Sequence, residues 1–202
     1  MTARDAGTPL ALRPFAAVVI GGSAGAIDAL SQILQALPAD FAPTVAVVLH
    51  LPRHRRSALP DVLARSSMLP VREPEDKEPL ARGTVYVAPP DYHLLIDDGP
   101  RFALSVDEPR NFSLPSIDVL FESAARVLGP AVVGVVLTGA NSDGAAGLRA
   151  ICDAGGVAIA QSEAEVRSMP EAARRACKGA EMLAAVAIGQ RLAALNPGGA
   201  RW

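Results

Sequence analysis

The sequence lacks the features that mark exported and membrane-spanning proteins. No uninterrupted apolar run approaches the roughly 20 residues that a transmembrane helix needs, so no membrane insertion is expected. Residues 1–14 contain no apolar signal-peptide centre, and we expect them to form a flexible leader. Only two cysteines occur, Cys152 and Cys177, with neither a CxxC pair nor a metal-ligand spacing. This predicts small buried thiols in a reducing compartment, and therefore a cytoplasmic protein.

An excess of charge of one sign is missing as well. The net charge of −2 at pH 7 excludes the uniformly basic surface of a nucleic-acid-binding protein. One local basic patch, PRHRR at residues 52–56, is compatible with a solvated loop or with a docking site. Apolar residues, in contrast, make up 50% of the 202 residues, enough for one core that buries roughly 70% of the unfolded surface. We therefore predict a single domain over residues 15–202.

Strand and helix patterns alternate along this domain. Short runs rich in β-branched residues predict buried strands at residues 16–20, 44–49, 84–87, 132–137 and 157–160. Apolar residues at three- and four-residue spacing predict helices at residues 27–36, 57–64, 116–127, 145–154 and 181–195. The alternation is typical of an α/β fold with a doubly wound, mostly parallel, Rossmann-like sheet flanked by helices. HLLI and RFALSV, separated by the turn signal DDGP, predict an antiparallel β-hairpin at the sheet edge.

Polar residues follow three of the predicted strands. In folds of this class, chemistry collects at the carboxyl ends of the parallel strands. Ser23 follows VVIGG, His50 follows VAVVL, and Asp143 lies a few residues after VVL. We expect all three side chains to project from the same edge of the sheet.

Each of these residues also has a local explanation. Ser23 is placed to cap the helix that follows it or to help bind a phosphate there, although GGSAG also matches the G-x-S-x-G turn that exposes a nucleophilic hydroxyl. Neither a P-loop lysine nor a GxGxxG spacing accompanies it. His50 alone is compatible with a structural histidine, and Asp143 with an N-cap of the helix predicted to begin at residue 145.

The combination of the three residues favours catalysis. A serine is a poor nucleophile at neutral pH unless a histidine takes its proton, and the histidine needs a carboxylate to fix its tautomer and stabilise the imidazolium. The predicted sheet edge offers one residue of each type. Their order along the chain excludes no triad, because a triad is defined by its geometry.

Five motifs resemble those of one enzyme family. They are VVIGGSAGAIDAL, VVLHLP, VYVAPPDYHLLI, LPSIDVLFESAA and LTGANSDGAAGLRAICDAGG. These are similar to the G-[AG]-S-x-G, Q-H-[ML]-P, Y-[IV]-A-P-x-x-x-H, R-P-S-[IV]-D-x-[LM]-F and L-T-G-M-G-x-D-G-A-x-G motifs of the catalytic domain of the chemotaxis protein-glutamate methylesterase family, CheB. They occur in the family's order over about residues 15–176.

The resemblance implies a role for each candidate residue. Ser23 aligns with the family's nucleophile, His50 with the general base that becomes the general acid, and Asp143 with the carboxylate that orients the imidazole. The backbone N–H groups of Ala24 and Ala140 align with the oxyanion hole. No metal and no organic cofactor is implied.

The resemblance also implies a reaction and partners. The reaction is hydrolysis of γ-glutamyl methyl esters on the cytoplasmic helices of chemoreceptors through an acyl-enzyme, with deamidation of receptor glutamines as a second activity. Nucleic acid is not an expected partner. The 202 residues contain no receiver domain, so the phosphorylation control of the family would have to come from a separate receiver protein.

The sequence departs from the family pattern in one loop and leaves some roles open. The segment at residues 161–173 is about two residues shorter than the family's Q-x-x-x-[ST]-x-x-x-x-G-M-P, which puts the substrate fit there in doubt. Ser116 and Asp118 match P-S-x-D but also suit a helix N-cap and a first-turn acid, and His93 suits a brace for the hairpin. Two other functions stay open: an esterase acting on another protein or on a small ester, and a non-catalytic nucleotide- or phosphate-binding α/β domain.

Overall fold

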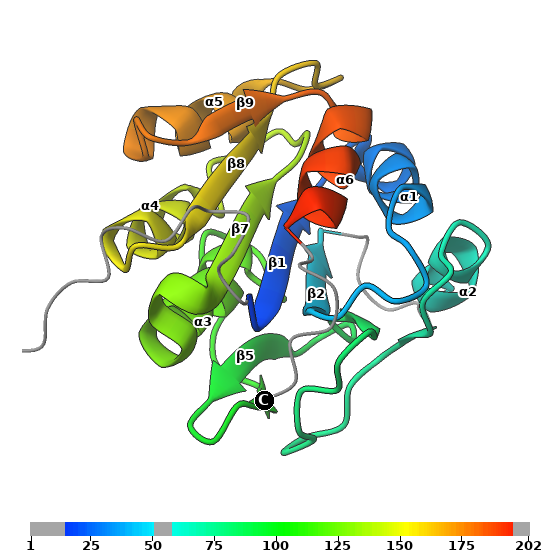
Figure 1. The fold of residues 1–202 in the computed structure, drawn as a ribbon. Helices are drawn as coiled ribbons and strands as arrows, with labels where there is room; N and C mark the ends of the chain where they lie inside the picture. Colours follow the sequence, from blue (N-terminus) through cyan, green and yellow to red (C-terminus); the bar gives the residue numbers. More distant parts are fainter. Residues whose placement is uncertain (1–14, 51–57, 196–202) are drawn as a thin grey trace, which may run out of the picture.

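The computed structural model describes residues 15–50 and 58–195 (Figure 1). The predicted leader at residues 1–14 and the basic patch at residues 52–56 lie outside the described residues. Within the described part of the chain, no helix is long and apolar enough to cross a membrane.

A seven-stranded sheet, parallel throughout, forms the centre of the molecule (Figure 1). Its strands are β1 (Ala17–Gly22), β2 (Thr44–Leu49), β3 (Val71–Arg72), β4 (Val85–Val87), β7 (Val132–Val136), β8 (Val157–Gln161) and β9 (Glu181–Leu183). They lie in the order β3-β4-β2-β1-β7-β8-β9. The central strands are buried on both faces, which explains why their sequences are continuous apolar runs.

Helices cover both faces of this sheet (Figure 1). They are α1 (Ala26–Gln35), α2 (Leu59–Ala64), α3 (Ile117–Leu128), α4 (Ala145–Asp153), α5 (Ser168–Ala176) and α6 (Ala185–Ala194), with a 3₁₀ turn at Gly129–Ala131. One apolar core lies between the sheet and α1, α2 and α6, and a second lies between the sheet and α3, α4 and α5. Alternate residues of β1 divide between the two cores: Val18 and Ile20 enter the first, and Val19 enters the second.

The predicted fold class is confirmed, with two corrections to its elements. The helix predicted at residues 181–195 is wrong in its first turn, because Glu181–Leu183 pairs with β8 and α6 begins only at Ala185. The antiparallel hairpin consists of β5 (His93–Asp97) and β6 (Arg101–Ser105), as expected. It does not extend the edge of the main sheet, however, because it forms a two-stranded sheet of its own whose apolar side chains pack in the same core as α3.

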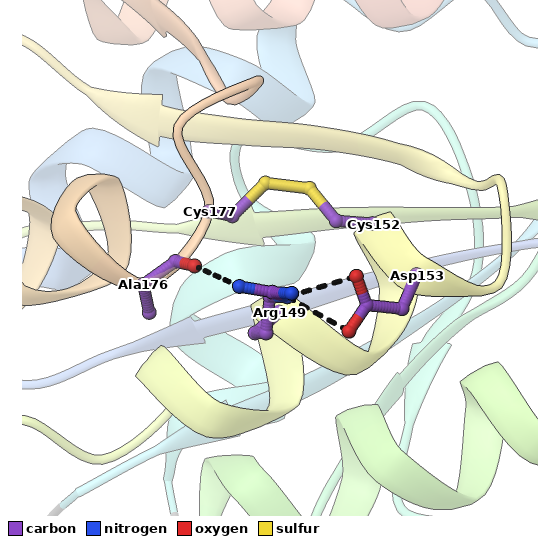
Figure 2. The surroundings of a disulfide bond; sticks show 5 residues. All are labelled: Arg149, Cys152, Asp153, Ala176 and Cys177. Carbon is purple, nitrogen blue, oxygen red and sulfur yellow. Dashed lines mark hydrogen bonds and ion pairs between the residues drawn. A yellow bond between two sulfur atoms is a disulfide. The ribbon is translucent and has the colours of Figure 1, made fainter.

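The prediction of two free thiols is wrong, because Cys152 and Cys177 form a disulfide (Figure 2). Cys152 lies in the last turn of α4 and Cys177 directly follows α5, so the bond joins the ends of two neighbouring helices. Beside it, Arg149 binds Asp153 one turn later at 2.7 Å. The two cysteines are 25 residues apart, and only the packing of α4 against α5 brings them together.

The contact between α3 and α4 depends on a glycine. A Cβ atom on Gly147 would lie 2.4 Å from the Cβ atom of Phe121 and 3.2 Å from the Cα atom of Asp118. Both distances are too short for a side chain to be added without moving one helix.

We expect Gly147→Ala to lower the free energy of unfolding by about 1–3 kcal/mol, because the clash with α3 outweighs the higher helix propensity of alanine. Urea unfolding followed by circular dichroism measures the change. Gly179→Ala is the matched control, since a Cβ atom at Gly179 would meet no atom within 4 Å, and it should change stability by less than about 0.5 kcal/mol. Equal effects of the two substitutions would contradict the close packing of α3 on α4.

Candidate active site

The ends of three parallel strands bring the predicted residues to one edge of the sheet. Gly22 of β1 lies opposite Leu49 of β2, and the N–H of His50 donates to the Gly22 carbonyl at 3.0 Å. The N–H of Ser23 donates to the carbonyl of Thr138, which follows β7, at 2.9 Å. Ser23 therefore lies between the residues that leave β2 and β7, as expected for the carboxyl end of a parallel sheet.

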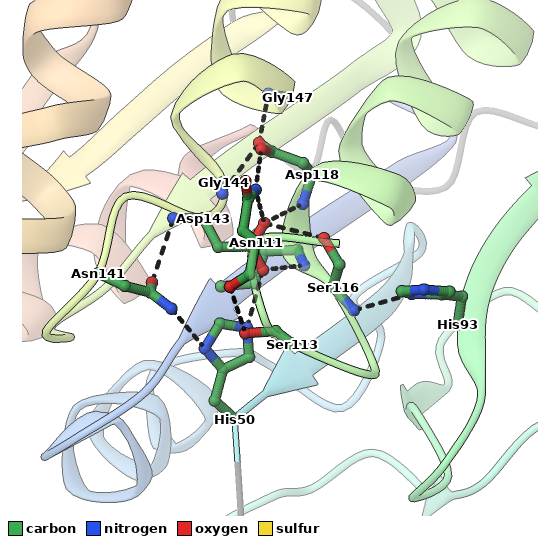
Figure 3. A network of polar contacts seen from close by, with 11 residues as sticks. His50, His93, Asn111, Ser113, Ser116, Asp118, Asn141, Asp143, Gly144 and Gly147 are labelled. Carbon is green, nitrogen blue, oxygen red and sulfur yellow. Dashed lines mark hydrogen bonds and ion pairs between the residues drawn. The ribbon is translucent and has the colours of Figure 1, made fainter. Parts of the chain in front are cut away.

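His50 and Asp143 are in direct contact (Figure 3). The distance from His50 Nε2 to Asp143 Oδ2 is 2.8 Å, and the side chain of His50 is 13% exposed while that of Asp143 is fully buried. Because a carboxylate can only accept this hydrogen bond, Nε2 carries the proton and Nδ1 holds a lone pair. Nδ1 is therefore the nitrogen that is able to act as a base, with the Asn141 amide nitrogen 3.5 Å away.

The hydroxyl of Ser23 makes no hydrogen bond to any of the described residues. Ser23 is half-buried and packs against Gly139. A Cβ atom added to Gly139 would lie only 3.0 Å from the Cβ atom of Ser23. Of the three predicted residues, the structure brings His50 and Asp143 into contact, and Ser23 stands at the neighbouring strand end without a hydrogen bond to His50.

The carboxylate of Asp143 is held by the start of α3 (Figure 3). The backbone N–H groups of Ile117 and Asp118 donate to it at 2.7 and 3.1 Å, and the Ser116 hydroxyl donates at 2.9 Å. These are N–H groups of the first turn of α3, which have no partner within the helix. Asp143 is therefore not an N-cap of α4, whose N-cap is Gly144; it satisfies the N-terminus of α3 instead.

Asp118 does the reverse. This buried carboxylate, from the first turn of α3, accepts hydrogen bonds from the N–H groups of Gly144 at 2.9 Å and Gly147 at 2.7 Å, at the start of α4. The side chain of Asn111 joins the two carboxylates, since its amide nitrogen is 2.8 Å from Asp118 and 3.0 Å from Asp143. Asp118 thus does more than interact with the dipole of its own helix, and sequence patterns do not show this role.

The two buried carboxyls differ in acidity. Burial alone would raise the pKa of Asp143, but the hydrogen bonds from His50, Ile117 and Asn111 hold it at about 2. Burial raises the pKa of Asp118, and the nearby charge of Asp143 raises it further, although the Gly147 N–H opposes this. Asp143 is therefore ionised beside His50 at neutral pH.

His93 and Ser116 link the hairpin to this network (Figure 3). His93 Nδ1 accepts a hydrogen bond from the Ser116 N–H at 3.1 Å, and its Nε2 lies 3.2 Å from the Glu108 carbonyl. His93 therefore braces the hairpin against the start of α3. Ser116 is the N-cap residue of α3 by position, but its hydroxyl binds Asp143 in place of a helix N–H.

The predicted oxyanion-hole donors are free. The N–H groups of Ala24 and Ala140 make no hydrogen bond to any acceptor in the described chain, and both residues are exposed. Gly139, the residue before Ala140, is held by two backbone hydrogen bonds. Its N–H donates to the Val166 carbonyl at 3.0 Å, and its carbonyl accepts from the Met169 N–H at 2.9 Å. Sequence reasoning missed this support, which comes from the segment that is shorter than the family pattern.

The cavity beside the start of α1 does not favour a phosphate. Its N-cap is Gly25, with a φ of 76°, so the Ser23 side chain does not cap the helix. A cavity of about 320 Å³ next to this helix start is lined by three carboxylates, those of Asp28, Glu163 and Glu165. Their negative charge repels a phosphate, which opposes the phosphate-binding interpretation.

Comparisons with known proteins agree with this geometry. Residues 18–192 match the family model for CheB methylesterase. A protein of Leptospira interrogans, provisionally named protein-glutamate methylesterase/protein-glutamine glutaminase, is 45% identical over 161 residues, which cover 79% of this chain and 83% of that protein. Protein-glutamate methylesterase/protein-glutamine glutaminase 1 of Xanthomonas campestris is 39% identical over 184 residues, which cover 89% of this chain and 51% of that protein.

A solved structure extends the likeness to the fold. The crystal structure of the Thermotoga maritima CheB methylesterase catalytic domain matches with a TM-score of 0.85 and 31% sequence identity. The match covers 91% of this chain and 100% of that one. The family resemblance inferred from the five motifs is confirmed.

The pKa of Asp143 predicts how stability changes in acid. Because its folded pKa, about 2, lies below the ordinary value of about 3.9, its contribution is complete above about pH 5 and is lost as the pH falls towards 2. We expect the difference in unfolding free energy between the wild type and Asp143→Asn to narrow by about 1–2 kcal/mol between pH 6 and pH 2.5.

Urea unfolding at the two pH values measures this change. Asp118→Asn is the matched control. Because the pKa of Asp118 is raised, the difference in unfolding free energy between the wild type and Asp118→Asn should widen, not narrow, as the pH falls. A difference for Asp143→Asn that stays constant or widens in acid would show that Asp143 is not held as the ionised group.

Proposed function

Because the chain belongs to the CheB methylesterase family of enzymes, we propose that it hydrolyses γ-glutamyl methyl esters through an acyl-enzyme on Ser23. His50 acts as the general base through Nδ1, and Asp143 orients its ring. The contact that carries the proposal is the 2.8 Å hydrogen bond from His50 Nε2 to the buried Asp143. It leaves Nδ1 as the basic nitrogen, on a residue whose backbone N–H binds the carbonyl of Gly22, the residue before Ser23.

The reaction begins with formation of the acyl-enzyme. His50 Nδ1 takes the proton of the Ser23 hydroxyl while Oγ bonds to the ester carbonyl carbon. The resulting oxyanion is stabilised by the N–H groups of Ala24 and Ala140, each a donor worth on the order of 3 kcal/mol. The tetrahedral intermediate then expels methoxide, which takes the proton from His50 and leaves as methanol.

Hydrolysis of the acyl-enzyme repeats these steps with water. His50 removes a proton from water as the water oxygen attacks the acyl carbon, and then returns the proton to Ser23 Oγ as that bond breaks. The products are a glutamate side chain and a free Ser23. Asp143 stays ionised because of its low pKa, and it stabilises the imidazolium in both halves of the reaction.

Methylated chemoreceptors are the proposed substrate, in their cytoplasmic helices. The names of the Xanthomonas and Leptospira relatives support methylated glutamate in a protein as the substrate, and they also support a second activity, the deamidation of protein glutamine. An amide passes through a similar tetrahedral intermediate, with ammonia as the leaving group. We also propose that residues 15–202 form a single catalytic domain.

Cytoplasmic localisation is part of this proposal and follows from the substrate. The argument from free thiols no longer supports it, because Cys152 and Cys177 are joined in the structure. Disulfides are uncommon in that compartment, so reduction of this bond in the cell is expected under the proposal.

Substitution of the nucleophile or the base tests the mechanism. We expect Ser23→Ala and His50→Ala each to lower methanol release from a methylated receptor by about 10⁴-fold or more. A serine-directed phosphonate should label the wild type at Ser23, as located by mass spectrometry. Ser142→Ala is the matched control, because Ser142 is an exposed serine in the loop before Asp143 and should keep full activity and labelling.

Each alternative has its own outcome in this experiment. Turnover retained by both triad variants would refute the acyl-enzyme mechanism. Hydrolysis of a panel of small methyl esters without any release from the receptor would favour an esterase with another substrate.

A further inference from the structure

One aromatic side chain is fully exposed beside the site. Phe112 is 100% exposed, more than any other large apolar residue in the described chain. The next most exposed is Val106 at 76%, and both belong to the segment between β6 and α3. A phenylalanine ring that buries no surface in its own chain is able to bury its surface against a binding partner.

The backbone at Phe112 is also unfavourable. Asn111 and Phe112 have φ values of 51° and 62° and form the centre of a tight turn. The turn is closed by hydrogen bonds between Arg110 and Ser113, from N–H to carbonyl in both directions, at 2.9 and 3.1 Å. A turn with two positive φ values suits asparagine first and glycine second, so phenylalanine is strained where glycine would fit. Local stability explains neither the exposure nor the residue type.

This turn is fixed to the catalytic network rather than free in solvent. The side chain of Asn111 binds Asp143 and Asp118, as described above, and Arg110 binds Glu122 of α3 at 2.6 Å. Phe112 is therefore held next to a residue that touches the carboxylate partner of His50. The backbone of Phe112 is held through its neighbours Asn111 and Arg110, while its side chain stays fully exposed.

We propose that Phe112 is a substrate-contacting residue that packs against the apolar side of a helical protein substrate next to the methylated glutamate. The inference rests on the proposed methylesterase function and adds a specificity determinant to it. A protein offers an apolar surface on which the ring can be buried, whereas a small methyl ester fills only the space at Ser23. Phe112 should therefore contribute to hydrolysis of a receptor and not to hydrolysis of a small ester.

Phe112→Gly separates the two substrates. The expected result is a KM for methylated receptor that is roughly 10- to 100-fold higher, from the loss of one buried phenylalanine, with little change in kcat. For a small methyl ester, kcat/KM should stay within about twofold. Glycine adopts positive φ readily, so the variant should fold at least as stably as the wild type, which thermal unfolding checks.

Three further variants serve as controls. Lys77→Gly removes another exposed side chain at positive φ, 66°, in the loop before β4. It should leave kcat/KM unchanged for both the receptor and the small ester. Phe112→Tyr keeps an aromatic ring and should retain most of the receptor activity. Asn111→Ala removes a hydrogen bond to Asp143 and should lower turnover of both substrates.

The possible outcomes are distinct. Equal losses for receptor and small ester in Phe112→Gly would mean that the turn only supports Asp143, and would overturn the proposal. An unchanged KM for methylated receptor would overturn the proposal too. If, with that KM unchanged, the wild type sediments as a dimer and Phe112→Gly as a monomer, the ring would serve to join two copies of the chain. If the wild type releases methanol from small esters but not from receptor, the proposed function fails and this inference falls with it.

Discussion

Two buried carboxylates hold the site together, because each accepts hydrogen bonds from the N-terminus of the neighbouring helix. Asp143, which precedes α4, accepts hydrogen bonds from the first N–H groups of α3. Asp118, in the first turn of α3, accepts hydrogen bonds from N–H groups at the start of α4. Each carboxylate needs donors because it is buried, and each helix start needs acceptors because its first N–H groups have none. Neither helix can shift along the other without leaving a buried charge unpaired, so the position of Asp143 is set by both.

The parallel sheet supplies the other half of the site. Ser23 and His50 leave neighbouring strands in register, and Thr138 leaves the strand on the other side of β1, so the backbone alone brings their positions together. The loop after Thr138 is then supported from outside the sheet, through the contacts of Gly139 with Val166 and Met169. The proposed nucleophile and base thus come from strand ends, and the segments that support the site come from later in the chain.

The sequence was informative about strands and much less about side-chain partners. Short runs rich in β-branched residues predict five of the seven strands of the main sheet, because strands buried on both faces leave that pattern. The short strand Glu181–Leu183 carries no such pattern and was read as helix. The motif P-S-x-D suits a first-turn acid at Asp118, and nothing in it shows that α4 begins beside this residue. The disulfide between Cys152 and Cys177 also depends on how two helices pack, which the spacing of the cysteines does not show.

The site divides catalysis and stability unevenly among its residues. The side chain of Ser23 stands at a strand end and makes no hydrogen bond to the described residues, so the fold does not depend on it, whereas His50 binds the buried Asp143. Asp143 is different, because the donors that hold its pKa near 2 include the first N–H groups of α3 as well as His50 and Asn111. Ionisation of the carboxylate, which the proposed role of His50 needs, and closure of the helix start, which the fold needs, depend in part on the same hydrogen bonds. Substitutions at Asp143 or at its partner His50 therefore cannot report on chemistry alone, whereas a substitution at Ser23 can.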